Sequence, residues 1–177
     1  MASTQSPTKL KELIYISVLI AVGIVLNLVE PPVFTSIPGP KLGLANIATL
    51  LALLLFGNGE AIIVASIRPI LSSFFKGALH PIPFFTSVVG SITAATIMII
   101  FYNLFKKQFS IVGISIIGGI TNNLAQFFVV LYITRNTAFW YYLPVLLLLG
   151  GVSGWIIGLI VKILYNRMGV VIKNGQP

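Results

Sequence analysis

Long apolar runs separated by short polar or proline-containing breaks dominate the chain. A helix needs about 20 apolar residues to cross the hydrocarbon core of a bilayer, which is about 30 Å thick. We therefore predict an all-α integral membrane bundle of about six transmembrane helices, forming a single membrane domain over residues 1–177. The predicted spans are about 13–29, 42–56, 61–75, 84–105, 111–133 and 141–165.

The second and third runs are short for spanning helices, because each extends only about 22 Å at 1.5 Å per residue. One interpretation is that flanking residues lengthen them into full spans. The other is that residues 42–56 and 61–75 form a re-entrant hairpin that enters and leaves on the same side. We favour full spans.

Composition agrees with the pattern, since 57% of the 177 residues are hydrophobic and only 8% are charged. A soluble domain carries about 25% charged residues on its surface. The chain has no cysteine and three acidic residues, all glutamate. Thiol chemistry and an aspartate-rich diphosphate–Mg²⁺ motif are therefore excluded. We expect no enzymatic activity, no cofactor and no metal site.

The net charge of +8 comes mainly from basic residues near the ends of apolar runs. With six spans, one side of the membrane carries more of these residues than the other, which places both termini in the cytoplasm. No basic stripe or nucleic-acid-reading motif is present, so no nucleic-acid partner is expected. The cytoplasmic set is Lys9, Lys11, Lys106, Lys107, Arg167 and Lys173, against Lys41, Lys76 and Arg135 outside.

Arg68 is the most informative polar residue, because it falls near the middle of the third run. An arginine at the centre of a membrane costs about 2.5–3.5 kcal/mol on insertion scales. On a helix it shares a face with Ser72 and Lys76. One hypothesis makes this face the cationic wall of a ligand pocket that opens outward. The other makes Arg68 structural, either in an ion pair with Glu30 or Glu60 or by snorkelling to the interface.

Amide side chains form a second polar group in the fifth run, at Asn122, Asn123 and Gln126, and Asn46 is a similar case in the second run. Amides inside a membrane need hydrogen-bond partners, which are either other helices or a ligand. The candidate ligand-binding residues are Arg68, Lys41, Asn46, Ser72, Lys76, Asn123 and Gln126.

Small residues recur every four positions in two places. Gly150, Gly154 and Gly158 predict a groove that admits a close helical neighbour. Ser17 and Ala21 form a similar patch in the first run. Internal packing is the simplest interpretation of both patterns.

Several strings resemble the bacterial membrane family named heptaprenyl diphosphate synthase component I, also called Gx transporters. They are residues 37–47 (Ile-Pro-Gly-Pro-Lys-Leu-Gly-Leu-Ala-Asn-Ile), Arg68, residues 109–118, and residues 123–126 (Asn-Leu-Ala-Gln). The resemblance covers about residues 13–165. The chain departs from the family at Asn122, where a histidine is expected before Asn123, so it lacks a titratable group there.

That family is similar in size and six-helix layout to the substrate-binding S-components of energy-coupling-factor vitamin transporters. The resemblance implies a multi-pass protein of the bacterial cell membrane. It also implies that residues 30–41 cover a ligand pocket from outside. Ser17 and Ala21 would then contact a transmembrane coupling subunit that works with ATPases.

Three functions remain open from the sequence. The leading one is a substrate-binding subunit for a small anionic or amphipathic ligand resembling a vitamin, a flavin or a quinone precursor. The alternative is a non-catalytic accessory membrane subunit in prenyl-diphosphate or quinone biosynthesis, and the third is a structural membrane scaffold.

Overall fold

The computed structural model describes residues 7–30, 43–76, 81–105 and 108–174. Every regular element in these residues is helical, which confirms the predicted all-α bundle. The elements are α1 (Pro7–Val29), α2 (Asn46–Leu55), α3 (Asn58–Phe75), α4 (Pro81–Leu104), α5 (Ile111–Thr134), the 3₁₀ helix η1 (Thr137–Tyr142) and α6 (Leu143–Asn174).

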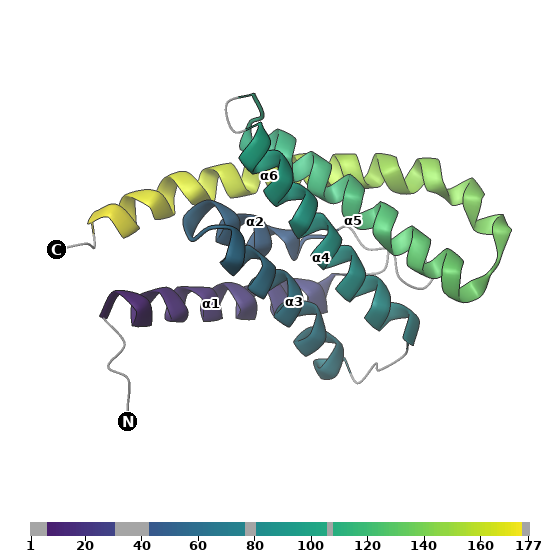
Figure 1. Cartoon of the computed structure of the whole chain (residues 1–177), viewed down its shortest axis with the longest axis horizontal. Coiled ribbons are helices and arrows are strands. Elements are labelled where there is room, and N and C mark those ends of the chain that lie inside the picture. Colours follow the sequence, from purple (N-terminus) through teal and green to yellow (C-terminus); the bar gives the residue numbers. More distant parts are fainter. Residues whose placement is uncertain (1–6, 31–42, 77–80, 106–107, 175–177) are drawn as a thin grey trace.

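Helices α1 and α6 run in opposite directions along the long axis of the molecule (Figure 1). The start of α1 and the end of α6 therefore lie at the same end. Helix α5 packs alongside α6, and α4 packs against α5. This arrangement agrees with termini on one side of the membrane, and the cytoplasmic orientation of that side stays a prediction.

Helix α2 is the buried centre of the bundle and contacts α1, α3, α4, α5 and α6. It is bounded by two glycines with positive φ, Gly43 (82°) and Gly57 (119°), a backbone conformation that other residues rarely adopt. Eight of its ten residues are buried, with Leu50 and Leu53 in the core cluster. Its ten residues rise only about 15 Å, half the thickness of the hydrocarbon core. The run 42–56 is thus a short helix enclosed by its neighbours.

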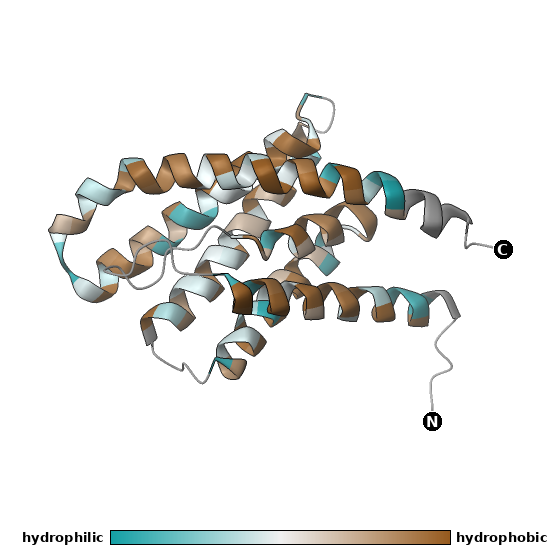
Figure 2. Cartoon of the chain, turned by 180° about the vertical axis from the view of Figure 1, so that it is seen from behind, coloured by the Kyte–Doolittle hydropathy of each residue, from teal (hydrophilic) through white to brown (hydrophobic). Residues whose placement is uncertain are grey.

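In the part of the chain that the structure describes, four segments are long and apolar enough to cross a membrane: Lys9–Val29, Ile82–Leu104, Ile111–Thr134 and Thr137–Met168. Much of their surface is apolar and uncovered, as Figure 2 shows along α1 and α6. Val25 and Trp155, for example, are 57% and 52% exposed. Such a surface requires lipid around it. The chain is therefore a membrane protein, while the count of six full spans stays a prediction.

The last helix begins two residues later than the sequence suggests. Residues 137–142 form the 3₁₀ helix η1, whose first turn is capped by the Asn136 side chain, which accepts from the Ala138 N–H at 3.0 Å. Helix α6 then starts at Leu143, followed by Pro144, whose fixed φ suits the first turn of a helix. The aromatic residues Trp140 and Tyr141 are exposed, and they belong to η1 and not to α6.

The α5–α6 seam depends on glycine. A methyl group at Gly154 would lie 2.6 Å from the Ser115 carbonyl oxygen, and one at Gly158 would lie 2.7 Å from Val112 Cα. Gly119 and Gly150 meet backbone to backbone in the same way. The close neighbour predicted from the four-residue repeat is therefore α5.

Candidate functional site

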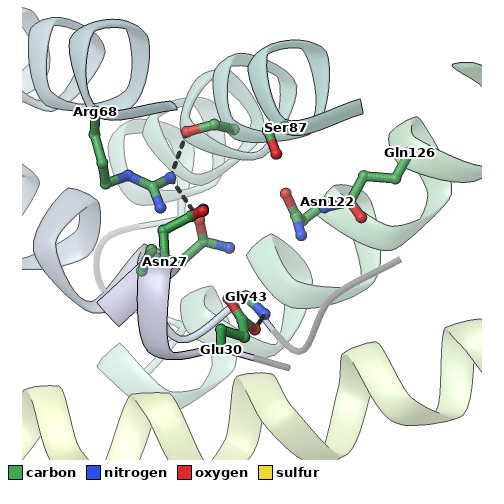
Figure 3. A pocket seen from close by; sticks show the side chains of 10 residues that line it. Asn27, Glu30, Gly43, Arg68, Ser87, Asn122 and Gln126 are labelled. Carbon is green, nitrogen blue, oxygen red and sulfur yellow. Dashed lines mark hydrogen bonds between the residues drawn. The ribbon is translucent and has the colours of Figure 1, made fainter. Parts of the chain in front are cut away.

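A polar cavity lies where α1 to α5 meet (Figure 3). The empty space between its lining residues is about 260 Å³, a figure that includes open solvent, so the enclosed part is much smaller. Eight of its ten lining residues have polar side chains, whereas small-molecule pockets are mostly lined by apolar ones. The lining residues are Asn27, Glu30, Gly43, Ala45, Asn46, Arg68, Ser87, Ser91, Asn122 and Gln126.

Arg68 forms the α3 wall of the cavity and is only 3% exposed, so it does not snorkel to an interface. Its Nη2 donates to Ser91 Oγ at 2.6 Å and, in a longer contact of 3.5 Å, to Asn46 Oδ1. Gly23 on α1 makes room for the arginine stem, because any side chain there would overlap Arg68 Cδ. The Arg68 side chain is thus held by three helices: its stem packs on α1, and its guanidinium donates to α2 and α4.

Glu30 directly follows α1 and forms the opposite charge in the cavity. Its carboxylate accepts the backbone N–H of Gly43 and, at 3.2 Å, that of Leu44. The carboxylate also interacts favourably with the charge of Arg68. The two interpretations of Arg68 are therefore compatible, since Arg68 lines a cavity and is also balanced by Glu30.

Helices α4 and α5 complete the cavity, and α5 contributes the amides of Asn122 and Gln126. Both amides lie opposite Gly90 of α4, where a methyl group would come within 2.8 Å of Asn122 Oδ1 and of Gln126 Cγ. Ser87 and Ser91 line the cavity from the same helix, one turn apart. Gly90 therefore leaves space for these two side chains. Figure 3 shows Asn122 and Gln126 on the α5 side of the cavity.

Three of the seven predicted ligand-binding residues line the cavity, namely Arg68, Asn46 and Gln126. Three others are engaged elsewhere, and Lys41 lies outside the described residues. Ser72 Oγ donates to the Pro69 carbonyl, Lys76 Nζ donates to the Asn27 carbonyl at 2.6 Å, and Asn123 Nδ2 donates to the Leu146 carbonyl at 2.9 Å.

The other polar lining residues were not among the predicted ligand-binding residues. Asn27 and Asn122 are visible in the sequence as amides within apolar runs, but their spacing alone does not place them at a cavity. Ser87 and Ser91 are separated by four positions, which is a weak signal of a common helical face. Glu30 was considered only as a partner for Arg68.

The exposed face of α1 carries Ser17 and Ala21, and both point away from the bundle. Ser17 Oγ donates to the Leu13 carbonyl of its own helix at 2.8 Å. Internal packing, the simplest interpretation of this patch, is therefore wrong for the single chain. The patch is open to lipid or to another protein.

The chemistry of the cavity is hydrogen bonding. Arg68 Nε and Asn46 Nδ2 are buried donors without a partner in the described part of the chain. Buried donors are nearly always paired in native proteins, so each unpaired one calls for an explanation. Within the described ranges, no group of three or more His, Cys, Asp or Glu is placed to hold a metal ion.

Comparisons with known proteins agree with this fold. The chain is similar to a solved protein described as the S component of a bacterial ECF transporter, at a TM-score of 0.64 and 22% identity. The match covers 93% of this chain and 99% of the other. No curated protein matches the sequence. The model of the family called heptaprenyl diphosphate synthase component I matches residues 19–164. The chain therefore belongs to the heptaprenyl diphosphate synthase component I family and has an S-component-like fold.

Proposed function

We propose that this protein is the substrate-binding subunit of a bacterial membrane transporter, and that its ligand is small and either amphipathic or anionic. The polar part of the ligand would occupy the cavity around Arg68. The observation that carries the proposal is the buried Arg68 of α3 with its unpaired Nε, set among amides and hydroxyls from four other helices.

The energetic cost of this arrangement favours a binding role over a structural one. An unsatisfied buried donor costs about 1–3 kcal/mol, and the structure keeps two of them at one cavity. A ligand that supplies acceptor atoms removes this cost. The likeness to a transporter S component supports the same role at the level of the fold.

A coupling partner is part of the proposal. The exposed Ser17 and Ala21 leave a shallow place on α1 where another transmembrane helix can approach closely. In the transporters that the chain resembles, such a surface meets a coupling subunit that works with ATPases. We extend that role to this patch.

Substitution of Arg68 tests the ligand role. Arg68→Ala should weaken binding of the co-purified ligand, identified by mass spectrometry, more than Arg68→Lys does, because lysine keeps the charge but not the planar fork. A hydrogen bond to a charged group contributes about 1.5–3 kcal/mol, which corresponds to about one to two decades in affinity.

The matched control is Arg135→Ala, which removes an exposed arginine at the end of α5 and should leave affinity unchanged. Melting temperature is measured on the same samples. Unchanged affinity together with a large loss of thermal stability in Arg68→Ala would make Arg68 structural and refute the proposal.

The family description favours a second candidate, a non-catalytic accessory subunit in prenyl-diphosphate or quinone biosynthesis. In that role the protein would present a lipidic substrate to a catalytic partner. The same mass spectrum separates the two, since a bound polyprenyl chain supports the accessory role and a small polar molecule supports the transporter role.

A further inference from the structure

Glu30 places a fixed negative charge at the cavity. Its side chain is 5% exposed, and its carboxylate accepts two backbone N–H groups just before α2. Hydrogen bonds from backbone donors stabilise a carboxylate, and the positive end of a helix dipole acts in the same direction. Glu30 is therefore held in place by the main chain.

The described lining residues contain one arginine and one glutamate, and the Lys76 ammonium lies just outside the cavity, 3.0 Å from the side-chain oxygen of the lining residue Asn27. The remaining polar lining residues are uncharged amides and hydroxyls. An anion that approaches Arg68 also approaches the Glu30 carboxylate, which already interacts with Arg68. Inside a membrane protein this repulsion is weakly screened.

The unpaired donors indicate what the ligand offers in return. Arg68 Nε and Asn46 Nδ2 both need an acceptor atom. A neutral carbonyl oxygen provides one without adding charge beside Glu30. The amide of Asn122 lines the cavity and has a carbonyl oxygen that can accept an N–H group of a ligand. None of the described lining residues is aromatic, so recognition here rests on hydrogen bonds and not on ring stacking.

We infer that Glu30 determines ligand specificity, making the cavity select a polar group of zero net charge over a carboxylate or phosphate of similar size. The selected group carries both a carbonyl acceptor and an N–H donor, as a carboxamide, a urea or a ring lactam does. This inference rests on the proposed binding function and narrows its ligand class to the neutral, amphipathic branch.

The test compares acetamide with acetate, which have the same shape and differ in charge. Binding to the purified full-length protein is followed by thermal unfolding at constant ionic strength. The wild type should bind acetamide at least about tenfold more tightly than acetate, and Glu30→Gln should reverse or abolish that preference by strengthening acetate binding. Glutamine keeps an oxygen that accepts the Gly43 and Leu44 N–H groups, so the fold should be retained.

Glu60→Gln is the matched control, because it removes the same charge from the first turn of α3, outside the cavity. It should keep the wild-type preference. If Glu30→Gln does not fold, Asn122→Asp tests the same idea in the other direction, since a second carboxylate at the cavity should weaken acetate binding by a larger factor than acetamide binding and so raise the preference for acetamide.

Preference of the wild type for acetate, an unchanged ratio in the variants, or binding of neither probe would overturn the inference. Arg68→Ala distinguishes this failure from failure of the proposed function. If Arg68→Ala weakens both probes while Glu30→Gln leaves their ratio unchanged, the site binds ligands but Glu30 does not select them. If Arg68→Ala changes neither probe, the binding function itself fails.

Discussion

Helix α5 has two polar faces with different environments, and the adjacent residues Asn122 and Asn123 mark them. Asn123 faces α6, where its amide donates to the Leu146 carbonyl. Asn122 faces α4 and lines the cavity. Each asparagine lies opposite a glycine of the neighbouring helix, Gly150 for Asn123 and Gly90 for Asn122.

The two glycines have different effects. At the α5–α6 seam, Gly150 lets two backbones touch, and Asn123 Nδ2 joins the helices by donating to the Leu146 carbonyl, while Asn123 Oδ1 is buried without a partner in the described part of the chain. At the cavity, Gly90 makes room for the side chains of Asn122 and Gln126, which fill the space beside it and line the cavity. The amide of Asn123 therefore lies where two backbones meet, whereas the amide of Asn122 lies where a side chain faces a glycine and lines the cavity.

The largest expected effect lies at the seam. Gly119→Ala places a methyl group against the Gly150 carbonyl, and neither backbone can move without separating α5 from α6. Overpacking of this kind costs about 3 kcal/mol of unfolding free energy. Unfolding in SDS-containing micelles measures it. Gly151→Ala is the control, because its nearest atoms are 3.9 Å away on the flexible Ile120 side chain. Equal stability of the two variants would contradict the backbone contact at the seam.

The two asparagines should separate stability from binding. Asn123→Ala removes the hydrogen bond from Asn123 Nδ2 to the Leu146 carbonyl, at a cost of about 0.5–1.5 kcal/mol. Asn122→Ala should cost less stability but weaken acetamide binding, since its amide faces the cavity. Unfolding and binding measured on both variants test this contrast. Similar behaviour of the two would show that the faces of α5 do not differ as described.

The smallest expected effect is at Gly90. Gly90→Ala crowds Asn122 and Gln126, but both contacts are with side chains that can rotate. We expect acetamide affinity to fall by about threefold, or ~0.6 kcal/mol, with little change in unfolding free energy. Isothermal binding measurements on the variant, with Gly59→Ala as control because nothing lies within 4 Å of that position, check this expectation. A large loss of stability would instead make Gly90 a seam glycine.

The fold was more predictable than the site. Apolar runs identified the helices, because lipid imposes one hydrophobic length on all of them. Within residues 42–56 only the ten residues of α2 are helical, and α2 is enclosed by protein, so lipid does not set its length. Glycine spacing predicted a close neighbour for α6 but not its identity.

Site residues were harder to predict, because the residues that line a cavity depend on how each helix is rotated about its own axis. Nothing in the sequence distinguishes Asn122 from Asn123. Because adjacent helical residues point in different directions around the axis, Asn122 lines the cavity and Asn123 lies at the α5–α6 seam. Lys76 shares a predicted face with Arg68, but its ammonium group donates hydrogen bonds to the carbonyl and side-chain oxygens of Asn27 near the end of α1. Glu30 could be recognised only after Gly43 was placed beside it.

The assembly of the cavity from five consecutive helices has a consequence for biogenesis. The α5–α6 seam joins neighbours in the chain, so it can form as soon as that hairpin is inserted. The cavity, in contrast, exists only after α1 to α5 have all docked, because each contributes a polar group to it. A ligand that binds there stabilises only the fully assembled chain, by RT ln(1 + [L]/Kd). The protein's abundance in the membrane should therefore rise with the supply of its own ligand, through protection from quality-control proteolysis during maturation.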